Sequence, residues 1–254
     1  MHDEPTLRQK LAAEFLGTGF LVLFGAGAVT ATFTLQPSKS NFSEADLGII
    51  ALSFALVITA MVYSVGRISG AHINPAVTVG LAVRGHIDPT TALEYIAAQL
   101  VGALGGALCI ALIFGRTAAQ AGILGVTSFG ASTNPLQALI AEAIGTFVLV
   151  YTVYGVGVDT KAPAGWAGLI IGLVVGSVIM VLGPVTGGSI NPARTFGPMI
   201  VQALLGGPNL LNQFWVYVVG PLVGGAAAGF AYEWVTLPRH EKAPAPASHQ
   251  TATT

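Results

Sequence analysis

The triplet Asn-Pro-Ala occurs twice in this chain, as Asn74-Pro75-Ala76 and as Asn191-Pro192-Ala193. Each copy follows a segment rich in glycine and serine and precedes a short apolar run. Asparagine is a preferred N-cap, and proline is favoured at the first helical position because the N–H that it lacks has no partner there. Each triplet therefore predicts the start of a helix. The asparagine oxygen would cap the first turn, which leaves the side-chain NH2 group as a donor facing away from the helix.

The composition places these helices in a membrane. Hydrophobic residues make up 53% of the 254 residues and charged residues only 8%, against about 25% charged in ordinary soluble domains. The net charge of −1 argues against a nucleic-acid partner. The single cysteine, Cys109, lies in an apolar run and is interpreted as a small core residue. The sequence implies no cofactor and no metal.

Six apolar stretches are long enough to cross a bilayer, which takes about 20 residues. They span 9–34, 47–66, 91–114, 136–157, 164–183 and 212–236. Two further stretches, 75–84 and 192–204, begin at the triplets and reach only about half of a hydrocarbon core that is about 30 Å thick. Non-helical backbone at membrane depth is tolerated only beside protein or a water-filled cavity. The sequence therefore predicts a polar path through the membrane.

The two halves of the chain repeat each other. The segment AEFLGT at 13–18 returns as AEAIGT at 141–146, and QLVG at 99–102 is echoed by PLVG at 221–224. Each half, about 8–114 and about 136–236, holds three spans, so the second copy crosses the membrane in the opposite sense. We expect one channel domain over residues 1–236. In it, the two short helices meet at mid-membrane from opposite sides.

The basic residues predict which ends face the cytoplasm, because lysine and arginine gather in cytoplasmic loops. With six spans, one side carries Arg8, Lys10, Arg84, Lys161, Arg239 and Lys242, and the other carries Lys39 and Arg116. Both termini are therefore expected in the cytoplasm. Residues 237–254 are rich in proline, alanine and threonine and are expected to form a disordered cytoplasmic tail.

The segments SGAHINPAV and GGSINPARTFGP, with the repeated AEF-GT and AEA-GT openings, resemble the aquaporin and glycerol-facilitator family, also called the major intrinsic protein family. The resemblance covers about residues 8–236 and is strongest to archaeal and related prokaryotic aquaporins. It implies an all-α membrane protein, a right-handed bundle of six transmembrane helices with two re-entrant half-helices. It also implies a passive, bidirectional pore for water or small neutral solutes in each subunit of a plasma-membrane homotetramer.

The re-entrant segments suggest how such a pore would work. Two half-helix N-termini at mid-pore, each with about half a positive charge, would disfavour cations. The amides of Asn74 and Asn191 would orient a passing water and interrupt a chain of proton transfer. Backbone carbonyls would supply acceptors along one wall; they belong to Gly70, Ala71, His72, Gly187, Gly188 and Ser189.

By resemblance, the narrow selectivity filter consists of Phe54, Ile179, Gly188 and Arg194. Placing the charge of Arg194 inside the membrane costs free energy, which makes this residue a functional candidate. The alternative is that Arg194 forms a structural ion pair. Water channels of the family usually have a histidine at Ile179 and a serine at Thr195. Glycerol facilitators usually have a second aromatic residue at Gly188 and an aspartate at Thr195. At these positions the chain matches neither the water channels nor the glycerol facilitators of the family, and it lies between these two branches.

Glu14 and Glu142 occupy matching positions in the first and fourth spans, where a carboxylate needs donors. The resemblance implies that they accept hydrogen bonds from the two re-entrant loops, with Gln99 assisting in the first half. The alternative is a proton-relay pair. His72 is interpreted as a fixed loop residue rather than a titrating gate. Glycines spaced by four, such as those at 102 and 106, are interpreted as helix-packing positions.

The function expected from the sequence is a water channel that excludes ions and protons and leaks some glycerol or small neutral gases. A glycerol facilitator is the first alternative, and a structural membrane protein with a vestigial pore is the second. An ion channel would need acidic or carbonyl rings that concentrate cations. An enzyme is not expected, because no HExxH motif, Ser/His/Asp set or phosphate loop is present.

Overall fold

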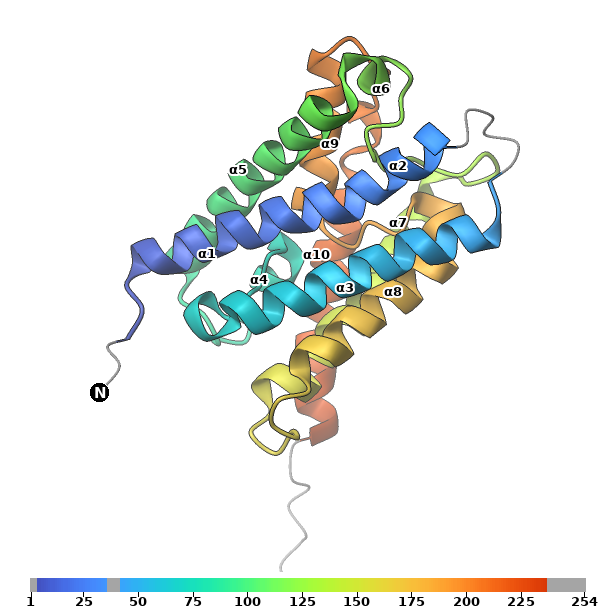
Figure 1. The fold of residues 1–254 in the computed structure, drawn as a ribbon. Helices are drawn as coiled ribbons and strands as arrows, with labels where there is room; N and C mark the ends of the chain where they lie inside the picture. Colours follow the sequence, from blue (N-terminus) through green and yellow to red (C-terminus); the bar gives the residue numbers. More distant parts are fainter. Residues whose placement is uncertain (1–3, 36–41, 237–254) are drawn as a thin grey trace, which may run out of the picture.

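The computed structural model describes residues 4–35 and 42–236, and all the elements in these two ranges are helices (Figure 1). Six of the helices are long and apolar enough to cross a membrane. They span Leu7–Leu35, Glu44–Ser69, Pro89–Phe114, Pro135–Val158, Ala167–Thr186 and Leu211–Thr236. The six predicted spans are thus confirmed. The expected tail at 237–254, with Lys39, Arg239 and Lys242, lies outside the described residues.

The elements follow the predicted order. The first span comprises α1 (Leu7–Phe20), the π-helical η1 (Leu21–Ala26) and α2 (Gly27–Leu35), and the second is α3 (Glu44–Ser69). After the half-helix α4 (Pro75–Ala82) come α5 (Pro89–Phe114) and the short α6 (Arg116–Gln120). The second half has α7 (Pro135–Val153) with the π-helical η3 (Tyr154–Val158), then α8 (Ala167–Thr186), the half-helix α9 (Pro192–Leu204), η4 (Leu211–Gln213) and α10 (Val216–Thr236).

Three spans begin at capping boxes, which explains why they start earlier than the apolar stretches alone suggest. In α1, α3 and α7 the caps are Thr6, Ser43 and Asn134, and each exchanges hydrogen bonds with the residue three positions on. The fifth span instead begins three residues later than expected, at Ala167. It ends at Thr186 and is followed by Gly187, whose φ of 79° is the left-handed conformation that closes a helix.

The two halves pack in equivalent ways. Helix α1 lies against α5, α7 lies against α10, and α3 lies against α8 across the two halves (Figure 1). A Cβ added at Gly102 would overlap the carbonyl oxygen of Phe15, and one added at Gly224 would overlap that of Ala143. These glycines therefore let the paired helices approach at corresponding places in each half.

The half-helices join the two copies. Helix α4 of the first half packs on α10 of the second, and α9 of the second half packs on α5 of the first. A Cβ at Gly80 in α4 would come 2.9 Å from the carbonyl oxygen of Gly225 in α10. The core therefore runs through both halves, and the half-helices are buried within it.

Candidate functional site: a cavity between two re-entrant loops

Both Asn-Pro-Ala triplets begin a helix, as the sequence predicts. The Asn74 Oδ1 atom accepts the backbone N–H of Ala76 at 2.8 Å. The Asn191 Oδ1 atom accepts from Ala193 at 3.0 Å and from Arg194 at 3.2 Å. In each triplet the proline occupies the first turn. The two asparagine side chains are therefore fixed at the tips of α4 and α9.

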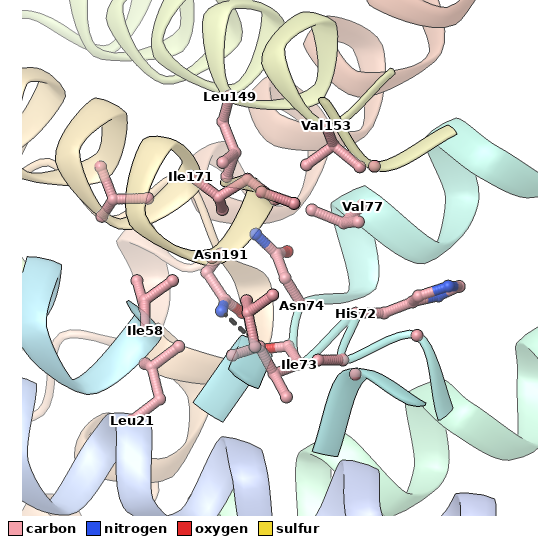
Figure 2. A pocket seen from close by; sticks show the side chains of 18 of the residues that line it. Leu21, Ile58, His72, Ile73, Asn74, Val77, Leu149, Val153, Ile171 and Asn191 are labelled. Carbon is pink, nitrogen blue, oxygen red and sulfur yellow. Dashed lines mark hydrogen bonds between the residues drawn. The ribbon is translucent and has the colours of Figure 1, made fainter. Parts of the chain in front are cut away.

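The amide groups of the two asparagines are less free than the sequence suggests. Asn74 Nδ2 donates to the carbonyl oxygen of Ile190 at 2.8 Å, and Asn191 Nδ2 donates to that of Ile73 at 2.9 Å. Figure 2 shows the two asparagines at the middle of the cavity, with Leu21 and Ile58 on one side and His72 on the other. An NH2 group has two hydrogens, so each amide keeps one donor beyond the bond to the opposite loop.

The backbone that supplies these carbonyls is strained. Ile73 has φ 42° and Ile190 has φ 47°, and Ala71 has φ 48°. A β-branched residue in the left-handed region is a genuine outlier, and such a conformation costs about 1–3 kcal/mol. Strain of this kind persists only where neighbouring groups hold the backbone in place.

Glu14 holds the first loop. Its carboxylate accepts the backbone N–H of His72 at 2.9 Å and of Ile73 at 2.7 Å. The Ser69 hydroxyl donates to it at 2.6 Å and Gln99 Nε2 at 2.8 Å. The structure thus brings Glu14 and Gln99 together with the loop, in the arrangement that the expected supporting role requires.

Glu142 holds the second loop in the same manner. It accepts the backbone N–H of Ser189 at 3.0 Å and of Ile190 at 2.6 Å, and the hydroxyl of Thr186 at 2.6 Å. Of the acidic side chains that the structure describes, only Glu14, Glu142 and Asp46 are buried, and Asp46 belongs to the capping box of α3. A proton relay would need a further acidic group between the two glutamates, and the described residues do not provide one.

His72 is fixed on two sides. Its Nδ1 atom lies 3.2 Å from the hydroxyl of Thr78, and its ring meets the Tyr95 ring edge-on with centroids 5.2 Å apart. These contacts agree with its interpretation as a fixed loop residue.

A cavity of about 760 Å³ lies between the loops and the spans. Apolar side chains surround the two asparagines on several sides, and they include Leu21, Ile58, Val77, Leu149, Val153 and Ile171 (Figure 2). The loop wall carries Gly70, Ala71, His72 and Ser189 with both asparagines. No acidic side chain lies in this lining, which consists of described residues only. Gly187 and Gly188 lie outside the lining.

The structure pairs the four expected filter residues, Arg194 with Phe54 and Gly188 with Ile179. The Arg194 guanidinium carbon lies 5.0 Å from the centroid of the Phe54 ring, and Ile179 lines the same cavity. Gly188 packs against Ile179, because an added Cβ would come 3.1 Å from the Ile179 Cα atom. Arg194 is only 3% exposed. No carboxylate of the described residues forms an ion pair with it, so the contacts do not support the alternative of a structural ion pair.

Arg194 has a partner that the sequence analysis missed. Its Nη1 atom donates to the carbonyl oxygen of Gly125 at 2.7 Å, in the segment that joins the two halves. Two residues on, the Thr127 hydroxyl lies 2.9 Å from that of Thr195. The only signal in the sequence was a glycine in a connecting segment, and such a glycine does not indicate which helix it faces.

Comparison with known proteins settles the family. The family model described as Major intrinsic protein matches residues 1–232. The chain belongs to the major intrinsic protein family. The fold, the inverted repeat and the paired half-helices described above are therefore features of a member of this family.

Among the relatives of this major intrinsic protein is the probable aquaporin AqpM of Archaeoglobus fulgidus, 44% identical over 91% of this chain and 98% of that protein. Aquaporin AqpM of Methanothermobacter thermautotrophicus is 41% identical, with the same coverage. An X-ray structure of the aquaglyceroporin from Plasmodium falciparum has the same fold, with a TM-score of 0.77 and 24% identity over 91% of this chain and 97% of that one. The resemblance to archaeal aquaporins is confirmed.

Proposed function

We propose that this major intrinsic protein is a passive, bidirectional water channel that excludes ions and protons. The observation that carries the proposal is the cavity centre, where Asn74 and Asn191 each keep a donor. The half-helix N-termini that they cap converge there. Water offers an acceptor oxygen to these donors and turns its hydrogens toward the loop carbonyls and neighbouring waters. Oriented in this way, it breaks a continuous chain of proton transfer.

Charge selection in this proposal comes from two positive features. The N-termini of α4 and α9 each contribute about half an elementary charge, and Arg194 adds a full charge. The lining carries no acidic group among the described residues that would offset them. A cation entering the cavity would lose hydration and gain no counter-charge. An anion would still have to leave water for a lining that is largely apolar.

We assign the filter to Phe54, Ile179, Gly188 and Arg194, with Asn74 and Asn191 at the centre. The loop carbonyls serve as acceptors, and Glu14, Glu142 and Gln99 support the loops. Ile179 is apolar and Gly188 adds no side chain, so this filter does not add the polar contact of a histidine or the bulk of an aromatic residue. The assignment predicts water as the main permeant, with some leak of glycerol or small neutral gases. Gly188 and Thr195 make a glycerol facilitator the second choice.

The family and the basic residues support a proposal for the assembly and the membrane orientation. We propose a homotetramer in the plasma membrane, with one pore in the domain over 1–236 of each subunit and both termini in the cytoplasm. The relatives are named as aquaporins, and the family is not an enzyme family. We assign this chain no catalytic activity.

Stopped-flow light scattering on proteoliposomes tests the proposal. Vesicles holding the purified protein are shrunk in impermeant sucrose and then reswollen in a glycerol gradient, with empty liposomes as the control. Fast shrinkage with slow glycerol reswelling is the expected result. Rapid reswelling would place the chain among glycerol facilitators. The absence of both fluxes from correctly assembled protein would contradict the channel proposal and favour a structural role.

A further inference from the structure

Two threonines, one in each half, make equivalent hydrogen-bond contacts with the first and second re-entrant loops. Thr78 and Thr195 each lie four residues after a capping asparagine. The Thr78 hydroxyl lies 3.2 Å from His72 Nδ1, and the Thr195 hydroxyl lies 2.5 Å from Ser189 Oγ. His72 and Ser189 both line the cavity. Each hydroxyl therefore fixes a loop residue next to the permeating solute.

The second side-chain partner of each threonine hydroxyl differs between the halves. In the first half, Gln99 Nε2 on α5 donates to the Thr78 hydroxyl at 3.0 Å. The corresponding position of α10 is Pro221, which has no polar side chain. Thr127 takes this place from outside the repeat, with its hydroxyl 2.9 Å from that of Thr195. It is only 2% exposed.

The segment that carries Thr127 also carries the acceptor for Arg194, the carbonyl of Gly125. A Cβ at Gly125 would lie 2.7 Å from the Cβ of Ala26 in η1. Further along, Phe129 N donates to Gln213 Oε1 at 3.0 Å, and Gly130 N donates to the Val185 carbonyl at 2.9 Å. The segment is thus held against three separate parts of the bundle.

Between these anchors, two side chains in the first turn of α9 contact the segment: Arg194 donates to the Gly125 carbonyl, and the Thr195 hydroxyl meets that of Thr127. Further along α9, Gln202 Oε1 accepts the backbone N–H of Leu124 at 3.3 Å. Arg194 and Thr195 are neighbours on α9. The Thr127–Thr195 contact therefore holds the segment two residues from the Gly125 carbonyl, beside the helix turn that bears the guanidinium. The position of that carbonyl decides how far the guanidinium extends toward Ile179 and Phe54.

We propose that Thr127 is a positioning residue that determines the selectivity of the filter, although it does not line the cavity. This inference rests on the proposed channel function and on the filter assignment. Without the hydroxyl, Arg194 is held less firmly at Gly125, the opening beside Ile179 widens, and glycerol is admitted more readily. Water already passes, so its flux changes less.

The test compares isosteric variants in the proteoliposome assay. Thr127→Val keeps the shape and removes the hydroxyl, whereas Thr127→Ser keeps the hydroxyl and removes the methyl group. Thr152→Val is the matched control, because the exposed Thr152 hydroxyl bonds only to the Val148 carbonyl one turn earlier on its own helix. The measured quantity is the ratio of glycerol to water permeability.

Thr127→Val should raise this ratio about fivefold, the change that corresponds to the loss of one buried hydrogen bond. Thr127→Ser should restore the wild-type ratio, and Thr152→Val should not change it. Should Thr127→Val fail to assemble, Thr195→Val removes the same contact from the other side, together with the contact to Ser189. Its ratio should rise at least as much, and Ser189→Ala, which removes only the second contact, separates the two effects.

Two results would overturn the inference. The first is that Thr127→Val has the same ratio of glycerol to water permeability as the wild type. The same holds for Thr195→Val if that variant is used instead. The other is an equal rise in Thr127→Ser and Thr127→Val, which would assign the effect to the methyl group; a Cβ at Gly187 would come 3.0 Å from Thr127 Cγ2. A wild-type protein that conducts neither water nor glycerol would instead contradict the proposed function itself.

Discussion

Arg194 and Phe54 face each other across the two halves of the repeat, with the guanidinium carbon 5.0 Å from the ring centroid. One residue lies on α9 and the other on α3. An arginine over an aromatic face gains a cation–π attraction that grows as water is excluded. Together with the Gly125 carbonyl, this contact stabilises a full charge inside the membrane without a salt bridge to any of the described residues.

Removing the charge should therefore relax selectivity. In Arg194→Ala we expect glycerol permeability to rise by about tenfold. The barrier that the fixed guanidinium presents to glycerol should be comparable to one hydrogen bond to a charged group, which is worth about 1.5–3 kcal/mol. Conductance to small cations should also appear, since the positive barrier is lost. Proteoliposome swelling measures the first effect and voltage-clamped bilayers measure the second. Unchanged values for both would contradict the filter assignment.

Weakening the support of the second loop should destabilise the protein. In Glu142→Gln, an amide NH2 group replaces one carboxylate oxygen. It faces N–H and O–H donors and cannot accept hydrogen bonds from them. We expect a loss of about 2–3 kcal/mol in the free energy of unfolding, seen as a lower melting temperature in detergent. Glu44→Gln, at an exposed position in the first turn of α3, should have little effect. Equal changes in melting temperature for the two variants would contradict the supporting role of Glu142.

The order of the spans could be predicted from the sequence because each signal is local. An apolar run of sufficient length, a capping box before it and a proline at the first turn each act within a few residues. The matched positions of Glu14 and Glu142 could be found for a similar reason, since an acidic residue is conspicuous in an apolar run.

The hydrogen bonds that join distant parts of the chain at the site could not be predicted. The bond from Arg194 to Gly125 and the contact of Thr127 with Thr195 join parts of the chain that are 69 and 68 residues apart. The acceptors for the asparagine amides are backbone carbonyls, which every residue carries. Their direction depends on the left-handed φ of Ile73 and Ile190, and isoleucine disfavours that conformation. Nothing in the local sequence indicates it.

Two glycines offer a matched test of helix packing. A Cβ at Gly102 would overlap the Phe15 carbonyl oxygen, whereas one at Gly48 would meet no atom within 4 Å. Gly102→Ala should lower the free energy of unfolding by about 1–3 kcal/mol through overpacking. Gly48→Ala should raise it by up to about 1 kcal/mol, because alanine favours a helix over glycine. Melting temperatures that moved in the same direction would argue against close packing of α1 on α5.

Mercury should not block the channel. Cys109 is exposed on α5, so its interpretation as a core residue is wrong, and it does not line the cavity. Hg(II) bound there lies outside the path. Ile179→Cys places a thiol at a residue that lines the cavity and should make water flux sensitive to Hg(II), with recovery on addition of a thiol. Reversible inhibition of the wild type would show that Cys109 reaches the path.

The loop between η3 and α8 should respond to acid. The backbone N–H of Lys161 and the hydroxyl of Tyr232 donate to Asp159 at 2.8 and 2.7 Å, and both lower the pKa of this carboxyl below its usual 3.8. A lowered pKa in the folded state contributes stability above the unfolded pKa, and this contribution is lost as pH falls through the folded pKa.

The difference in melting temperature between wild type and Asp159→Asn should therefore shrink as the pH is lowered from about 6 to about 3. Tyr232→Phe removes one of the two donors and should weaken the dependence without abolishing it. A difference that stays constant with pH would show that the carboxylate charge does not matter at this site.

The exchange of hydrogen bonds between Asn74 and Ile190 and between Asn191 and Ile73 makes each half depend on the other. Neither half contains the acceptor for its own asparagine, so one half alone would leave its central amide without this partner. A substitution that moves the loop backbone of one half therefore disturbs the asparagine of the other half, and the centres of the two halves can change only together.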